Sequence, residues 1–232
     1  MRVKSDRRRR SPHPGVRSRA RPDAPRLPGR PAGANGDRTR ARILDSAVDV
    51  FARDGLAGAS LRDIAQRARI RVSTLYHYFP SKEALYQEVQ DGVNSHIREL
   101  TVAVLGRGLD LRETASEVIG ALFDFFLAHR AYVRLGYRMC LEGGTWLEND
   151  QRVAARWLGL AEGMLKPAEI RGVVKRVDPV LFLVTVDALL HWHVVNDGVY
   201  RRLFGRGLGD REIAARVRAH VVEVSLRTLG ID

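Results

Sequence analysis

The sequence has few of the residues that stabilise secreted or membrane-spanning proteins. It contains one cysteine, Cys140, so no disulfide can form within the chain, which is typical of the reducing cytosol. Its longest apolar run, residues 177–195, is interrupted by aspartates and histidines and is not the uninterrupted stretch of roughly 20 residues that a membrane span needs. Residues 1–36 lack the apolar stretch that follows the basic start of a secretory signal. We therefore expect a cytoplasmic protein without a membrane partner.

The sequence also lacks sustained alternation of polar and apolar residues, which is the pattern of a strand. Apolar residues recur instead at helical spacing, as at Ile43, Ala47 and Phe51. Beyond residue 108 we predict helices over 111–129, 132–142, 150–165, 167–176, 178–204 and 210–229, with one of the breaks at Pro167. The sequence therefore predicts an all-α protein, with a small N-terminal helical domain and a larger C-terminal bundle.

Proline is scarce after residue 36, because six of the nine prolines fall before it. The same segment holds eleven Lys or Arg residues and two Asp, which leaves it +9 of the chain's net charge of +12. A segment of this composition cannot bury a core, so residues 1–36 are predicted to be a disordered basic arm. The arm either adds contacts to the phosphates of DNA or is an extension without function, from a start codon assigned too early.

Signals for four helices follow one another from residue 37 onward. The first helix is predicted over 38–54 and ends at Gly55. Ser60 is placed to cap a second helix, and a turn at residues 69–71 leads into a short third helix. Ser81 caps a fourth, which runs to about residue 105.

A short helix, a tight turn and a third helix with polar outer residues form a helix-turn-helix. In that motif the second of the two helices enters the major groove of DNA. Arg71 can pair with both acceptors of guanine, and Ser73 can serve either base pair. Hydroxyl groups, lysines and helix N-termini bind phosphates. The predicted DNA-binding residues are Ser60, Arg62, Arg71, Val72, Ser73, Thr74, Tyr76, His77, Tyr78 and Lys82.

Over residues 38–86 the sequence resembles the tetracycline-repressor (TetR) family of bacterial transcriptional regulators. The matching residues are Ile43-Leu44, Ala47, Phe51, Gly55, Ser60, Ile64-Ala65, Ala68, Ile70, Thr74-Leu75-Tyr76, Tyr78-Phe79, Ser81-Lys82-Glu83 and Leu85. Two positions depart from the family pattern: Arg69 replaces the usual glycine, and Arg71 replaces a small capping serine. We expect the turn to be made at modest strain by a residue with a Cβ, and the third helix to lack its usual cap.

The resemblance implies a helix-turn-helix domain over 37–86 and a C-terminal domain over 87–232 for ligand binding and dimerisation. The homodimer would form through the last two long helices, 178–204 and 210–229, with valines such as Val217, Val221 and Val224 in the interface. Its partners would be double-stranded DNA at a palindromic operator and an unknown small-molecule effector. The effector would act by shifting the long fourth helix. Repression is the commoner mode of such families, and activation stays open.

Aromatic and histidine residues in the C-terminal part are candidates for an effector cavity, which is typically apolar with a few polar groups. The predicted ligand-binding residues are Phe126, Tyr137, Trp157, His191 and Trp192. His191 and His193 point to nearly opposite sides of a helix, so they cannot share a metal ion. Asp187 and His191 are four residues apart and can pair, either in a pocket or at an interface. We predict no metal and no cofactor, and Cys140 is expected to be packing rather than a redox sensor.

Two other function classes compete with a transcriptional regulator. An enzyme would need a convergent acid, base or nucleophile set, and the sequence contains no recognisable catalytic motif, so we predict no enzymatic activity. A sequence-neutral architectural protein would bind any duplex through the basic arm. That alternative explains the arm but not the helix-turn-helix. We therefore predict a ligand-responsive, sequence-specific repressor that a small molecule releases from its operator.

Overall fold

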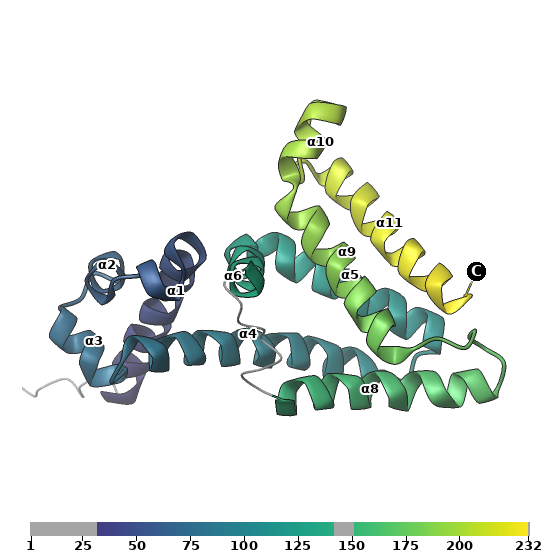
Figure 1. The fold of residues 1–232 in the computed structure, drawn as a ribbon, viewed down its shortest axis with the longest axis horizontal. Helices are drawn as coiled ribbons and strands as arrows, with labels where there is room; N and C mark the ends of the chain where they lie inside the picture. Colours follow the sequence, from purple (N-terminus) through teal and green to yellow (C-terminus); the bar gives the residue numbers. More distant parts are fainter. Residues whose placement is uncertain (1–31, 142–150, 232) are drawn as a thin grey trace, which may run out of the picture.

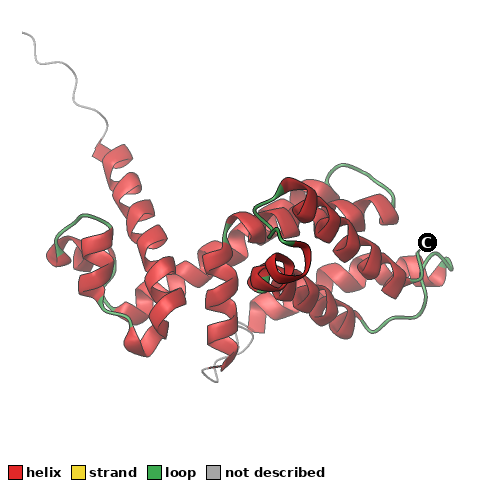
Figure 2. Ribbon diagram, turned by 90° about the horizontal axis from the view of Figure 1, so that it is seen from above, coloured by secondary structure: helices red, strands yellow, loops and turns green. Residues whose placement is uncertain are grey.

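The computed structural model describes residues 32–141 and 151–231, and every regular element within these ranges is a helix. The helices are α1 (Ala32–Gly58), α2 (Leu61–Arg67), α3 (Val72–Tyr78), α4 (Lys82–Leu105), α5 (Leu111–Ala128), α6 (Arg130–Leu141), α8 (Gln151–Ile170), α9 (Pro179–Val195), α10 (Asp197–Phe204) and α11 (Arg211–Leu229). Helices α1 to α3 form a small head, and α4 runs from it into the larger helical body, with α8 below it and α5, α6 and α9 above it in the view of Figure 1. Figure 2 shows the described elements as helices joined by loops. The predicted all-α architecture is confirmed.

The head is built around Phe51 of α1, whose side chain is fully buried. Its ring meets Tyr86 of α4 edge-on, with the ring centroids 4.8 Å apart. Leu75 and Phe79, from α3 and its C-terminal end, are buried in the same core. A seven-residue helix such as α3 is marginal alone, and this packing supplies its support.

Helix α1 differs from the sequence expectation at both ends. It begins at Ala32, before the predicted start of order at Asp37, and the rest of the predicted arm lies outside the described residues. Gly55 does adopt a positive φ of 71°, which glycine reaches at little cost. A second helical stretch follows this kink and continues to Gly58, so the regular helix is interrupted at Gly55, as predicted, although α1 extends beyond it.

The turn between α2 and α3 confirms the consequences of both departures from the family pattern. Ser60 caps α2 by accepting a hydrogen bond from the backbone N–H of Arg62 at 3.1 Å. Arg69 makes the turn with a φ of 54°, and Arg71 stands at the N-cap of α3 without a side-chain hydrogen bond. Arg42 of α1 donates to the carbonyl of Ala68 and, at 3.4 Å, to that of Arg69. This arginine therefore holds the turn from outside.

Replacing Arg69 by glycine is expected to stabilise the protein by about 0.5–1 kcal/mol. The left-handed conformation costs a residue with a Cβ about 1–2 kcal/mol, and the greater freedom of glycine in the unfolded chain returns part of that gain. Urea unfolding of the two proteins without DNA measures the difference. Arg71→Gly is the control, because Arg71 has an ordinary φ of −78° and gains nothing from the change. A lower stability for Arg69→Gly would contradict the strain at this turn.

The body has its core between α5, α9 and α11, with Phe123, Ile213 and Val221 almost fully buried. This packing corrects the predicted dimer interface. Val217 and Val221 face the core of their own chain and are 7% and 0% exposed, so they are not available to a partner. The prediction was wrong for these two valines because an apolar stripe on a helix does not say which neighbour it faces. Val224 is only half-buried, and its place in an interface stays a prediction.

Two predicted helix boundaries in the body are also wrong. Pro167 lies inside α8, which ends at Ile170, so no helix covers 167–176. Proline lacks the backbone N–H that donates a hydrogen bond within a helix. Because Pro167 lies in the last turn of α8, only one such bond is lost and the helix continues to Ile170. The helix predicted over 178–204 breaks at Asn196 into α9 and α10, at an angle of 61°. The buried Asp197 carboxylate accepts from the backbone N–H of Leu208 and pairs with Arg201, which ties α10 to the following loop.

Within residues 32–141 and 151–231, no single helix has the length and apolar character needed to cross a membrane. The bent pair of α9 and α10 reaches that length and composition only when the two helices are taken together.

Candidate nucleic-acid interface and effector cavity

Helix α3 presents most of its predicted contact residues outward. Arg71, Ser73 and His77 are exposed, and Tyr76 is 53% exposed. Thr74 is half-buried. Val72 and Tyr78 are half-buried and pack partly against the core of the head, and their contact with DNA stays a prediction. The outer face available to a major groove therefore consists of residues 71, 73, 76 and 77, with Thr74 at its edge.

Lys82 has a structural role that sequence reasoning missed. Its ammonium donates to the carbonyls of Ala57 and Ala59 at 3.3 and 3.1 Å, at the C-terminal end of α1. The charge is thus placed where unpaired helix carbonyls gather. One of its three N–H groups is left for a phosphate.

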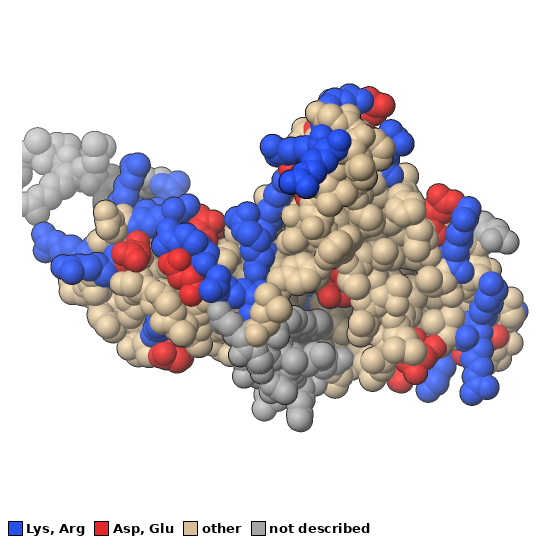
Figure 3. All heavy atoms as spheres, turned by 45° about the horizontal axis from the view of Figure 1, so that its top comes forward, with Lys and Arg blue, Asp and Glu red and all other residues tan. Residues whose placement is uncertain are grey.

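Basic side chains gather on one face of the head (Figure 3). Two of these basic side chains form ion pairs within the protein: Arg40 pairs with Glu88, and Arg67 pairs with Asp49. In the described part of the chain, Arg62 and Arg71 have no acidic partner. These two cations therefore remain free to meet an anionic backbone.

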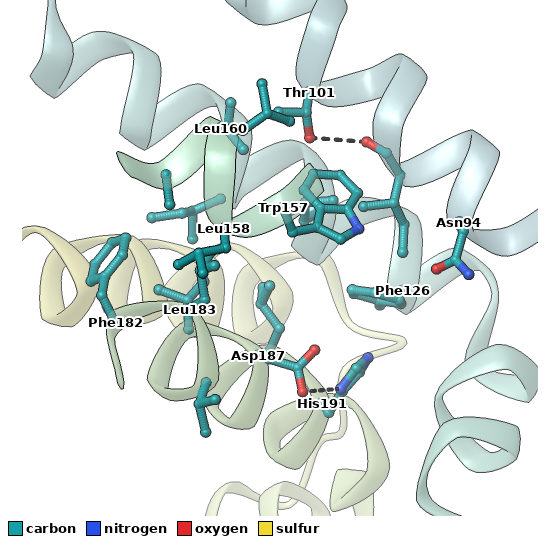
Figure 4. A pocket seen from close by; sticks show the side chains of 18 of the residues that line it. Asn94, Thr101, Phe126, Trp157, Leu158, Leu160, Phe182, Leu183, Asp187 and His191 are labelled. Atoms are coloured by element: carbon teal, nitrogen blue, oxygen red, sulfur yellow. Dashed lines mark hydrogen bonds and ion pairs between the residues drawn. The ribbon is translucent and has the colours of Figure 1, made fainter. Parts of the chain in front are cut away.

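A cavity of about 460 Å³ lies in the body, between α4, α5, α6, α8 and α9 (Figure 4). Phe126, Trp157 and His191 line it, in the places that the sequence predicted. Tyr137 is not one of the lining residues, and its ring centroid lies 6.1 Å from that of His191. Trp192 is 59% exposed on the outer side of α9, so its predicted contact with a ligand is wrong. Helix α9 is apolar on every side, and its spacing alone cannot separate the inner from the outer face.

Few polar side chains reach the cavity. Asp187 and His191 of α9 pair across one helical turn, with 3.1 Å between Oδ2 and Nδ1, as their spacing predicted. The ring of His191 also meets Phe126, with centroids 4.5 Å apart. Sequence reasoning missed four polar lining residues because nothing marks the inner faces of α4 and α6: Gln90, Asn94, Thr101 and Tyr132. Burial and, to a lesser extent, the charge of Asp45 raise the pKa of Tyr132, so its hydroxyl stays a hydrogen-bond donor.

The cavity and the head share one wall. Leu135 and Met139 of α6 line the cavity and are also buried in the core of the head. Met139 accepts a hydrogen bond from the Gln90 amide of α4 at 3.2 Å. Arg138 donates to the carbonyl of Arg53, near the kink of α1, at 2.7 Å. The wall of the cavity formed by α6 therefore contacts both α1 and α4.

A second apolar surface runs along the outside of α9 and α10. We call it the α9 stripe; it consists of Leu181, Val184, Trp192, Val195, Val199 and Leu203, all between 41% and 71% exposed. Val184 also borders the cavity. Exposed apolar patches of this extent mark interaction sites in most proteins. In residues 32–141 and 151–231, no group of three or more His, Cys, Asp or Glu side chains could hold a metal ion.

Comparison with known proteins identifies the family. The model of bacterial regulatory proteins of the tetR family matches residues 43–89, and that of the tetracyclin repressor-like C-terminal domain matches residues 112–224. The transcriptional repressor NicS of Pseudomonas putida is 24% identical over 198 residues, which is 83% of this chain and 93% of that protein. The repressor SCO4008 of Streptomyces coelicolor is 29% identical over 184 residues, or 76% and 88% of the two chains.

Solved structures agree with these matches. Transcriptional regulator SCO4942 of Streptomyces coelicolor superposes with a TM-score of 0.65 at 27% identity, over 84% of this chain and 99% of that one. The regulator FadR of Bacillus subtilis, solved with stearoyl-CoA, has the same fold, with a TM-score of 0.62 at 19% identity over 81% and 98% of the chains. The two matched domains and the shared fold show that this chain belongs to the TetR family of bacterial transcriptional regulators, which bind DNA operators and small molecules and are not enzymes.

Proposed function

We propose that the protein is a homodimeric repressor, released from a palindromic operator when a small apolar molecule enters the cavity. The observation that carries this proposal is the shared wall, in which Leu135 and Met139 belong both to the cavity and to the core of the head. The names of its relatives NicS and SCO4008 describe transcriptional repressors, which favours repression over activation. Such a protein would act in the cytoplasm, where bacterial DNA lies.

The DNA-binding domain would comprise residues 37–86 and the effector domain residues 87–232, with α4 spanning the boundary. Arg71, Ser73, Tyr76 and His77 would face the bases. The flanking Ser60, Arg62, Thr74 and Lys82 would contact phosphates. The basic arm would add salt-dependent affinity without reading sequence.

A second copy of the chain would pack against the α9 stripe. A dimer built there presents two copies of α3 to major-groove faces one helical turn, about 34–36 Å, apart. A ligand that changes the shape of the cavity would move α6 and α4, and with them the spacing of the two heads. The coupling required is modest, since about 1–3 kcal/mol changes DNA affinity roughly 5–150-fold.

Tyr76→Ala is expected to weaken operator binding about tenfold or more while the protein stays folded and dimeric. Tyr76 is 53% exposed, so its removal costs little stability but deletes a contact worth about 1–3 kcal/mol. Fluorescence anisotropy with a labelled operator measures the loss. Tyr76→Phe is the matched variant and separates the hydroxyl group from the ring. Unchanged affinity in Tyr76→Ala would mean that α3 does not face DNA as proposed.

Selection of bound duplexes from a random DNA pool tests the proposed function as a whole. The selection is done near physiological salt with bulk competitor DNA present. Enrichment of an imperfect palindrome is the expected result, because a specific regulator prefers its site by about 10³ or more. If no sequence is enriched and binding disappears as salt rises, the alternative, an architectural protein driven by the basic arm, replaces this one.

A further inference from the structure

One carboxylate reaches the effector cavity among largely apolar walls. Asp187 of α9 accepts a hydrogen bond from His191 through Oδ2. Its other oxygen has no partner within the described ranges, and Figure 4 shows it turned away from His191. A carboxylate offers about four acceptor positions, so a single imidazole leaves most of them unused.

The Asp187 side chain is 44% exposed, so water reaches it while the cavity is empty. A ligand that displaces this water leaves the carboxylate beside apolar walls, which is costly unless a cation or further donors replace the water. Among the lining residues that the structure describes there is no Lys or Arg. When Nδ1 of His191 carries the imidazole proton, Nε2 is an acceptor as well. Once a ligand has displaced the water around Asp187, the donors that replace it have to come from the ligand.

The aromatic side chains nearby suit a cation. Phe126 lies against His191, with 4.5 Å between the ring centroids, and Trp157 lines the same cavity. The faces of such rings attract a positive charge, most strongly where water is displaced. A volume of about 460 Å³ has room for an apolar body of ordinary ligand size.

We propose that the effector is a lipophilic amine, whose protonated nitrogen binds Asp187 near Phe126 while its apolar body fills the cavity. This inference rests on the proposed function in taking the cavity as the effector site. It separates this protein from its structural relative solved with stearoyl-CoA, since a ligand with an anionic head would meet the like charge of Asp187.

Three probes with the same ten-carbon chain test the proposal: decylamine, 1-decanol and decanoate. Each is titrated into the full-length protein without DNA, below its micelle concentration, and binding is followed by calorimetry. We expect decylamine to bind at least tenfold more tightly than 1-decanol, and decanoate to bind most weakly. Asp187→Asn should remove the advantage of the amine and leave the affinity for 1-decanol unchanged. The exposed Asp91 of α4 supplies the control, Asp91→Asn, which should bind all three probes as the wild type does.

Decanoate binding as tightly as decylamine would overturn the proposal, and so would an amine preference that survives in Asp187→Asn. Absence of binding by all three probes would overturn it too. If Asp187→Asn does not fold, the comparison of the three probes on the wild type decides alone. Release of a labelled operator is measured separately. Amine binding without release would refute the proposed function while leaving this inference intact.

Discussion

Replacing Phe51 by alanine is expected to destabilise the protein by about 3–5 kcal/mol and to abolish operator binding. Phe51 is fully buried and its ring contacts Tyr86 of α4, so the change opens a cavity where the head joins α4. The lost aromatic pair adds about 0.5–1.5 kcal/mol to the cost of that cavity. Urea unfolding followed by circular dichroism measures the stability, and fluorescence anisotropy measures binding to the operator.

Val102→Ala provides the control for this result. Val102 lies on the same long helix, α4, but is 52% exposed, so its truncation should change stability by no more than about 0.5 kcal/mol. A loss below about 1 kcal/mol in Phe51→Ala would show that the head does not depend on the contact between α1 and α4.

The second large effect is expected from Val195→Glu, which should convert the dimer into monomers and lower operator affinity about 100-fold or more. Val195 is 41% exposed in the middle of the α9 stripe, and a charge buried there without a partner strongly opposes association. The linkage of two heads in a dimer raises the affinity for the operator by about 10²–10⁴, and a monomer loses this gain. Analytical ultracentrifugation measures the mass, and anisotropy measures binding to the operator.

Val102→Glu introduces the same charge at an exposed valine outside the stripe and should leave the dimer intact. If Val195→Glu remains a dimer at micromolar concentration, the stripe is not the interface. If it becomes a monomer that still binds the operator with full affinity, the proposed dimeric mode of DNA recognition is wrong.

The head was predictable because its signals are local. The caps of Ser60 and Ser81 act within three residues of the chain, and the strain at Arg69 follows from its own side chain. Even here the neighbours decided some outcomes. The partners of Lys82 are carbonyls of α1, 23 and 25 residues away in the sequence, and no local pattern indicates them.

The body was predictable in most of its helices, apart from those expected over 167–176 and, unbroken, over 178–204, but not in the faces of those helices. The spacing of Asp187 and His191 predicted their pairing, but whether the pair serves a cavity or an interface depends on what packs against α9. Trp192 was predicted to face a ligand and is 59% exposed, whereas Val221 was predicted to face a partner and is fully buried. In both cases the sequence indicated an apolar residue on a helix but not the neighbour that it faces. Both lie on helices with apolar residues on more than one side.

The sequence by itself therefore determined the helices, the helix-turn-helix and its two unusual arginines, because hydrogen bonding and backbone preference act between near neighbours. Only the tertiary structure decided which apolar residues enclose the cavity, which form the α9 stripe and which join α6 to the head. The physical reason is that burial of apolar surface is non-directional. A helix that is apolar all round has several equivalent faces, until the packing of distant helices assigns each face its neighbour.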